Sequence, residues 1–214
     1  MNGTKKIICT YDKLSKLTEL INPSDYRLLI DEYHCLLKAY SYRQVAIDGV
    51  LESFMKYKSF CFMSATPINT TFRPDCLKDV RQVTAIWGKT DKMKVDLIPT
   101  NKPYVYAANV IKAYQKDGYI EINGMKSHEA YFFINSVKDI ADIINHCNLS
   151  NDKVRIICAD TESNRKKLSN YTISNSRSLN KMFNFITSKS FEGADYFSDD
   201  GICFVVSSAS NPHT

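Results

Sequence analysis

Residues 27–34 read Arg-Leu-Leu-Ile-Asp-Glu-Tyr-His, an apolar run that ends in the adjacent carboxylates Asp31 and Glu32. The run is short and bounded by polar residues, which predicts a β-strand over residues 26–31. Open α/β sheets bind ligands at the carboxyl ends of their strands, so we expect both carboxylates at a functional edge. A helix amino terminus, where negative charge is favourable, is the alternative interpretation of this pair.

A second apolar run, residues 59–63, follows about thirty residues later and ends in Ser64, Ala65, Thr66 and Pro67. Its aromatic side chains and short length also predict a strand. Small hydroxyl residues before a proline are typical of a capped turn, and taken alone the stretch indicates nothing more.

Strand-like runs alternate with segments of helical period along most of the chain, which is typical of a mostly parallel sheet covered by helices. The alternation weakens between 89 and 126, where prolines and glycines interrupt it. We therefore expect α/β lobes at 1–98 and 128–214, joined by a connection at 99–127. The expected strands are 6–10, 26–31, 59–63, 82–87, 130–135, 153–159, 182–187 and 201–207, and the expected helices are 13–21, 42–57, 105–116, 137–147 and 162–170.

The composition is that of a globular protein: of 214 residues, 44% are hydrophobic and 24% charged, which excludes a disordered or fibrous chain. The longest wholly apolar runs span only a few residues, so we expect no membrane span. The amino terminus is too polar for a signal-peptide core, and we expect a cytoplasmic protein. A formal charge of +5 permits a polyanionic partner without requiring one.

The seven cysteines occur singly, with no Cys-x-x-Cys pair and no histidine at metal-ligand spacing. We interpret them as buried thiols, which behave as small apolar side chains. A hydrolase site that uses a cysteine with His34 or His128 is an alternative, but no nucleophile motif of a known kind supports it.

The two strand-end motifs, in this order and at this spacing, resemble motifs two and three of the superfamily two helicases of DEAD/DEAH-box type. Further stretches resemble other motifs of that family: residues 8–14 are similar to motif one-a, residues 131–136 to motif four, and residues 187–195 to motif five. The last of these places a threonine before Glu-Gly-x-Asp, and a glycine-containing turn is its alternative interpretation. The resemblance implies two tandem RecA-like lobes with mostly parallel sheets.

The resemblance also implies roles for individual residues. Asp31 would hold Mg²⁺ through water and Glu32 would act as the general base in ATP hydrolysis, so these two are the expected catalytic residues. Residues expected to couple the nucleotide to the nucleic acid are His34, Ser64, Thr66, Gly193 and Asp195. Residues expected to contact the backbone of a single strand of DNA or RNA are Thr10, Tyr11, Asn135, Ser136, Thr187 and Ser188.

Two family motifs are missing from the sequence: the glycine-rich Walker A loop with its lysine, and motif six with its arginines. We therefore expect an incomplete first lobe with an exposed sheet edge, through which the chain could pair with another segment. The leading interpretation is a truncated core of an ATP-dependent helicase or translocase that lacks ATPase activity as written. Mg²⁺ and ATP would belong to the complete enzyme, with neither bound by this chain. The alternative is a catalytically silent, helicase-like module that binds nucleic acid or protein.

Overall fold

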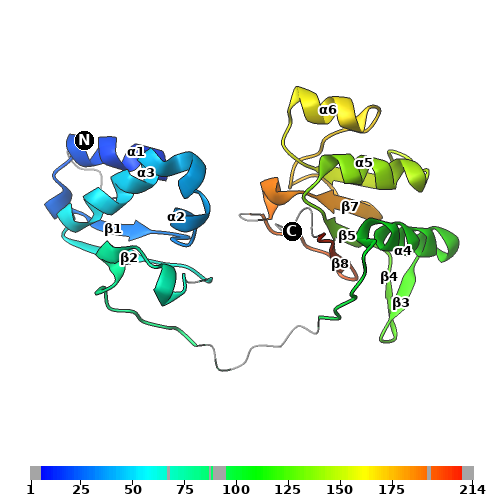
Figure 1. Cartoon of the computed structure of the whole chain (residues 1–214), viewed down its shortest axis with the longest axis horizontal. Coiled ribbons are helices and arrows are strands. Elements are labelled where there is room, and N and C mark those ends of the chain that lie inside the picture. The colour runs from blue at the N-terminus through cyan, green and yellow to red at the C-terminus, as the bar shows by residue number, and fades with distance from the viewer. Residues whose placement is uncertain (1–5, 67, 87, 89–94, 192–193, 209–214) are drawn as a thin grey trace. The chain divides into compact units, whose positions relative to one another are not determined.

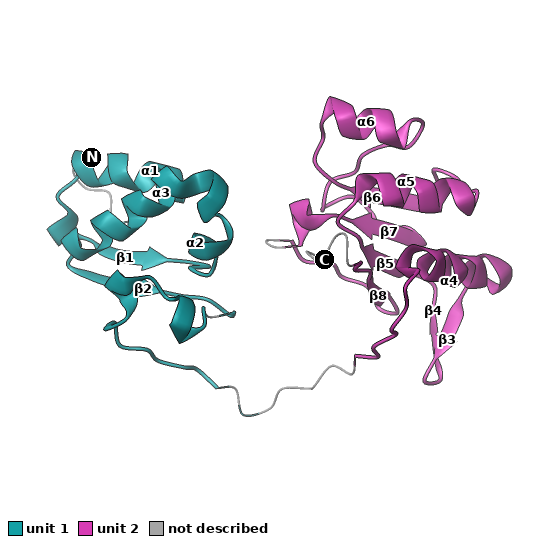
Figure 2. Cartoon of the chain, viewed as in Figure 1, with its two compact units in different colours: residues 1–91 teal, residues 92–214 magenta. Residues whose placement is uncertain are grey.

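The computed structural model describes residues 6–66, 68–86, 88, 95–191 and 194–208 (Figure 1). The chain forms two compact units, Met1–Asp91 and Lys92–Thr214 (Figure 2). Each unit combines α-helices with parallel strands, so the chain belongs to the α/β class, as the alternating pattern predicts. Within the described residues, no helix has the length and apolar character needed to cross a membrane.

The first unit contains a two-stranded parallel sheet in which Leu28 pairs with Phe60 and Ile30 with Phe62. Its strands are β1 (Arg27–Ile30) and β2 (Ser59–Phe62), its helices are α1 (Tyr11–Leu20), α2 (Cys35–Lys38) and α3 (Tyr40–Ser53), and its 3₁₀ turns are η1 (Pro23–Asp25), η2 (Phe54–Lys56), η3 (Thr70–Phe72) and η4 (Asp75–Leu77). Helices α1 and α3 lie side by side (Figure 1). The expected helices 13–21 and 42–57 and strands 26–31 and 59–63 agree with these elements within a few residues.

The described residues of the first unit cover only one face of this sheet. Successive strand residues point to opposite faces, and the buried set includes Ile30, which joins Phe54 and Phe60 in the core. The rings of Phe54 and Phe60 meet edge to face with centroids 4.6 Å apart. On the other face Leu29 is 59% exposed and Cys61 is also exposed. The first unit therefore leaves apolar strand surface in contact with solvent.

The second unit contains a four-stranded parallel sheet in the order β6-β7-β5-β8 and a separate antiparallel hairpin. The sheet strands are β5 (Ala130–Phe133), β6 (Val154–Ile157), β7 (Phe183–Ile186) and β8 (Ile202–Val205), the hairpin strands are β3 (Ile120–Ile122) and β4 (Met125–Ser127), and the helices are α4 (Pro103–Asp117), α5 (Val137–His146) and α6 (Glu162–Leu168), with the 3₁₀ turn η5 (Ser188–Ser190). Helices α4 and α5 lie on one side of the sheet (Figure 1).

The core of the second unit includes helix α4, although this helix falls within residues 99–127, the expected connection. Ile111 and Tyr114 of α4 are fully buried and share a cluster with Phe132 and Phe183 of the sheet. The rings of Tyr114 and Phe183 meet edge to face with centroids 5.8 Å apart. A smaller cluster on the opposite face of the sheet includes Tyr131.

Two of the expected strands are wrong. Residues 6–10 and 82–86 form no strand, and Trp87, at the end of the second, lies outside the described residues. Ile8 is 98% exposed and Ile86 is 87% exposed, so neither run packs on a sheet. A short apolar run becomes a strand only when a neighbouring strand pairs with it, and local pattern does not reveal the neighbour.

The structure also contains elements that the pattern analysis missed. Helix α2 is only four residues long, and the β3–β4 hairpin turns at Asn123 and Gly124, whose φ angles are 52° and 79°. Asn-Gly with two positive φ angles is the signature of a two-residue hairpin turn, so the hairpin had a local signal.

The interpretation of the cysteines as buried thiols is also wrong in part, since only two of the seven are buried and four are exposed. Cys61 is exposed on the uncovered sheet face, and Cys203 lies on the edge strand β8. The buried cysteines are Cys147 and Cys158, Cys35 is partly buried, and the exposed ones are Cys9, Cys61, Cys76 and Cys203.

Candidate functional site

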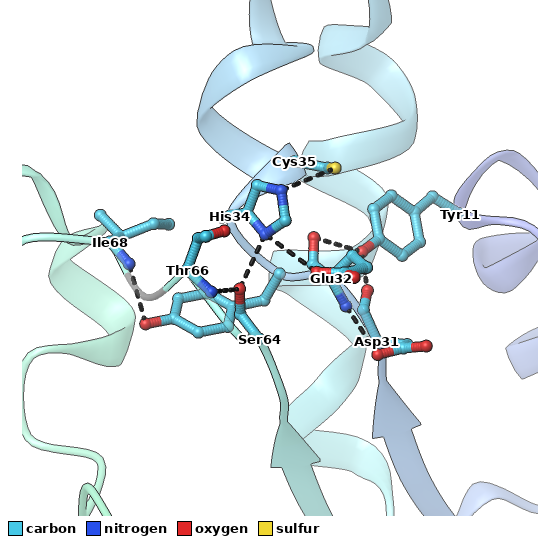
Figure 3. A network of polar contacts seen from close by, with 9 residues as sticks. Tyr11, Asp31, Glu32, His34, Cys35, Ser64, Thr66 and Ile68 are labelled. Atoms are coloured by element: carbon cyan, nitrogen blue, oxygen red, sulfur yellow. Dashed lines mark hydrogen bonds and ion pairs between the residues drawn. The ribbon is translucent and has the colours of Figure 1, made fainter. Parts of the chain in front are cut away.

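The carboxyl ends of β1 and β2 bring the two strand-end motifs together in the first unit (Figure 3). The backbone N–H of Met63 donates to the carbonyl of Ile30 (2.8 Å), and that of Tyr33 donates to the carbonyl of Met63 (3.0 Å). These bonds extend the pairing beyond the strands into the residues that carry the polar side chains. Parallel pairing thus places the Asp-Glu and Ser-Ala-Thr motifs side by side.

His34 joins the two motifs directly. Its Nδ1 lies 2.7 Å from the hydroxyl Oγ of Ser64 and 3.1 Å from the carboxylate Oε2 of Glu32, while its side chain is only 10% exposed. Ser64 Oγ also accepts a hydrogen bond from the backbone N–H of Thr66 (3.0 Å). The imidazole Nε2 faces Cys35 Sγ at 3.7 Å. The sequence motifs predicted four residues of this cluster, Glu32, His34, Ser64 and Thr66, whereas Cys35 was not among the expected site residues.

The backbone at Glu32 is in the left-handed region, with φ of 49°. A side chain with a Cβ atom is strained there, at a cost of about 1–2 kcal/mol. Tyr11 compensates, because its hydroxyl donates to the carbonyl of Asp31 and lies 3.3 Å from that of Glu32. The Glu32 N–H in turn donates to Asp31 Oδ1 (3.0 Å). Burial, with a smaller contribution from neighbouring acidic groups, raises the pKa of Tyr11 to about 12.

The residues at these strand ends fit the Mg²⁺ and ATP that the family resemblance implies only in part. Asp31 and Glu32 are both exposed, and an exposed carboxylate can hold the water shell of Mg²⁺. In the described part of the chain, however, no three His, Cys, Asp or Glu side chains are grouped so that they could hold a metal ion. The sequence has no glycine-rich loop with a lysine to cradle the phosphates. The residues therefore suit the hydrated metal but not the triphosphate.

The second unit places two of the expected strand-binding residues in contact. The backbone N–H of Ser188 donates to Asn135 Oδ1 (3.3 Å), so the motif-four and motif-five stretches meet beyond the ends of β5 and β7. Ser136 caps α5 by accepting a hydrogen bond from the N–H of Asp139 (3.3 Å). Ser188 is exposed and Asn135 is partly exposed, so their polar groups can reach a ligand.

Thr187 is buried, unlike the expected strand-binding residues Asn135 and Ser188. It is only 5% exposed, and its hydroxyl donates to the carbonyl of Ile157 (3.2 Å). This hydroxyl therefore already has a partner within the unit. Of the remaining expected site residues, Thr10 is exposed directly before α1 and Asp195 is exposed in the second unit, while Gly193 lies outside the described residues.

Sequence reasoning missed one charged residue of the second unit, Arg155. It lies in the middle of the apolar strand β6, is 2% exposed and reaches the ring of Tyr196. The sequence did contain a signal for this residue, a single arginine inside the apolar run Val154–Ile157. Charged side chains are rarely fully buried unless other groups pair with them.

Comparison with known proteins gives no match: no family model, no curated protein and no solved structure matches this chain.

Proposed function

We propose that this chain is part of the core of a superfamily two helicase or translocase, with two RecA-like lobes, the first of them incomplete. It binds the backbone of a single strand of DNA or RNA and does not hydrolyse ATP by itself. The observation that carries this proposal is the contact of His34 Nδ1 with Ser64 Oγ (2.7 Å), which links a strand end bearing Asp-Glu to one bearing Ser-Ala-Thr. A chance pair of motifs would not need to meet through their polar side chains.

The second unit supports the same proposal. Ser188 and Asn135 place a hydroxyl and a side-chain amide at one edge of the parallel sheet, and Lys189 is exposed beside them. Small polar side chains and a cation are groups with which proteins contact phosphates. Such contacts carry no base-specific information, so we expect little sequence preference and a strong dependence of affinity on salt.

The chain is expected not to hydrolyse ATP because it lacks the loop that would hold the phosphates of ATP. The carboxylates Asp31 and Glu32 are present. In a complete enzyme, Asp31 would hold the water shell of Mg²⁺ and Glu32 would stand at the attacking water. Without a phosphate cradle, this chain has no means of positioning the triphosphate against them. We therefore assign Mg²⁺ and ATP to the complete enzyme.

Strand binding is tested with the full chain and fluorescein-labelled oligo(dT) and oligo(U), by fluorescence anisotropy between about 50 and 200 mM salt. Ser188→Asp places a carboxylate where the proposal places a phosphate, and it should weaken binding about tenfold. Ser163→Asp, at an exposed position in α6, makes the same change of charge elsewhere and should leave the affinity unchanged. Equal affinities of the two variants, or binding that salt does not alter, would refute the proposal.

The nucleotide arm of the experiment adds Mg²⁺-ATP to the same titrations and measures phosphate release. We expect no release above the blank and no change in affinity. Hydrolysis that is lost in Glu32→Gln would show that the chain is a complete ATPase, and the proposed assignment of ATP to a larger enzyme would be wrong.

A second function, binding to another protein, is favoured by the uncovered face and the edge of the β1–β2 sheet. Leu29 is 59% exposed and Met63 is 45% exposed on this sheet. Unpaired strand edges and exposed apolar surface are the usual starting points for pairing with another chain. Leu29→Lys should abolish concentration-dependent self-association in sedimentation velocity if the partner is a second copy, and leave strand binding intact.

A further inference from the structure

The second unit buries a cation, Arg155, in the centre of strand β6. The residue is 2% exposed, and its neighbours in the strand are apolar. An arginine keeps its charge at ordinary pH, so the charge itself is buried. Burying a charge costs several kcal/mol unless polar groups compensate for it. A leucine would fill the position without that cost. The contacts of the arginine side chain must therefore compensate for the burial of its charge.

Among the described residues, the guanidinium is held by a loop and not by a carboxylate. Its Nη1 donates to Asn180 Oδ1 (2.7 Å), and its Nη2 donates to the carbonyls of Ser176 (2.7 Å) and Asn175 (3.3 Å). Within the part of the chain that the structure describes, its Nε has no hydrogen-bond partner and none of the ion pairs involves Arg155. The cost of burying the charge is therefore offset mainly by hydrogen bonds to Asn175, Ser176 and Asn180, which lie in chain segments without regular structure.

The contacts of Arg155 continue into residues 187–198, which comprise the stretch that resembles motif five and the three residues after it and are called the motif-five segment below. Asn180, which accepts a hydrogen bond from Arg155, donates through Nδ2 to the carbonyl of Phe197 (2.7 Å). The guanidinium carbon lies 5.7 Å from the centre of the Tyr196 ring, within the range of a cation–π contact. The hydroxyl of Tyr196 donates to the carbonyl of Ser190 (3.1 Å). Through Tyr196 and Asn180, one buried side chain is thus linked to both described stretches of the segment, 187–191 and 194–198.

We propose that Arg155 is a positioning residue for the motif-five segment. It acts through Asn180 and Tyr196 to hold Ser188 and Asp195 in place on the sheet. The part of this proposal that concerns ligand binding rests on the proposed function, because it assumes that Ser188 contacts the nucleic acid. The structural part, that Arg155 orders the segment, does not depend on any ligand.

Limited proteolysis tests the structural part. Lys189 is exposed within η5, and cleavage by trypsin after it requires the segment to open locally. Lys126, exposed in the β3–β4 hairpin of the same unit, serves as an internal reference. Arg155→Met should raise the ratio of cleavage at Lys189 to cleavage at Lys126 about tenfold, as quantified by mass spectrometry. Arg177→Met removes the same charge from an exposed position in the neighbouring loop and should leave the ratio unchanged.

If Arg155→Met unfolds the whole second unit, cleavage at Lys189 and at Lys126 will rise together. A second variant then tests whether Arg155 orders the segment. Asn180→Asp keeps an acceptor for Arg155 but removes the donor to the carbonyl of Phe197. It should raise the same cleavage ratio about threefold while the melting temperature stays close to that of the original protein. A merely structural role would lower the melting temperature without changing the ratio. An unchanged ratio in Asn180→Asp overturns the proposal.

Anisotropy with oligo(dT) and oligo(U) tests the part that rests on the proposed function. We expect Asn180→Asp to weaken strand binding about fivefold. A raised cleavage ratio with unchanged affinity would overturn the link between Arg155 and strand binding. If the original protein binds no strand while the cleavage ratio still rises, the proposed function fails and the ordering role of Arg155 stands.

Discussion

The imidazole Nδ1 of His34 lies 2.7 Å from the hydroxyl Oγ of Ser64, although the two residues are 30 positions apart in the sequence. This contact joins the residues that follow the two strands of the first unit. The Ser64 hydroxyl also accepts a hydrogen bond from the backbone N–H of Thr66. The same hydroxyl therefore contacts residues of both strand-end motifs.

The first prediction concerns the free energy of this contact. Ser64→Ala removes two hydrogen bonds and should lower the free energy of unfolding of the first unit by about 1–2 kcal/mol. A double-mutant cycle with His34→Ala should give a coupling energy of about 1 kcal/mol between the two side chains. Urea denaturation followed by circular dichroism measures both, and Thr70→Ala, at an exposed position, is the control. A coupling energy of zero would mean that the contact has no energetic role.

The second prediction concerns the left-handed backbone at Glu32. Glu32→Ala and Glu32→Gly both remove the carboxylate that faces His34, so they differ only in the Cβ atom. Because φ is 49° at this position, the glycine variant should be the more stable of the two by about 1 kcal/mol. Thermal denaturation compares them directly. Equal stabilities would show that the positive φ angle imposes no strain.

The third prediction distinguishes a structural from a ligand-binding role for Thr187. Its hydroxyl donates to the carbonyl of Ile157, so Thr187→Val should lower the free energy of unfolding of the second unit by about 1 kcal/mol. Thr187→Ser, which keeps the hydroxyl, should lose less. Strand affinity should be the same for both variants under conditions in which they are folded. Weaker strand binding of Thr187→Val at unchanged stability would instead assign the hydroxyl to a phosphate.

The fourth prediction concerns the pH dependence of stability. Arg43 forms an ion pair with Asp12 and holds the pKa of that carboxyl below its usual range. A carboxyl whose pKa is lower in the folded chain stabilises the fold above its unfolded pKa, and this contribution is lost as the pH falls through the folded pKa. Asp12→Asn should therefore lower the melting temperature at about pH 7 and have little effect at about pH 2.5.

The control for this prediction is Glu19→Gln, which removes a charge from an exposed position on the same helix. Both side chains of the Asp12–Arg43 pair are partly exposed, so the shift in melting temperature should also shrink in high salt. A difference between Asp12→Asn and the original protein that persists at about pH 2.5 would show that the pair does not act through its charge.

Much of the secondary structure could be predicted because its signals are local. The strands around Leu28, Phe60, Phe132 and Phe185 are apolar runs bounded by polar residues, and helix α5 has a clear amphipathic period. The run around Ile8 has the same local character but remains without a strand partner, so the prediction for it was wrong. Pairing depends on segments distant in the sequence, which a local pattern does not contain.

Some contacts in the candidate site could likewise be predicted from the sequence, and others could not. Parallel strands end at one edge of a sheet, so the meeting of the residues after β1 with those after β2 could be expected from their motifs. The support that Tyr11 gives to the backbone at Glu32, and the contact of Cys35 with His34, could not. These depend on where helices α1 and α2 pack, and therefore on the whole first unit.

The sequence by itself determined which segments are apolar, where they end, and which polar side chains follow them, because hydrophobic period and turn chemistry act over a few residues. Tertiary structure alone decided that α4 belongs to the core of the second unit and that Arg155 is buried against a loop. Burial and side-chain contact depend on packing among elements far apart in the chain, and the free energy of that packing is a property of the fold as a whole.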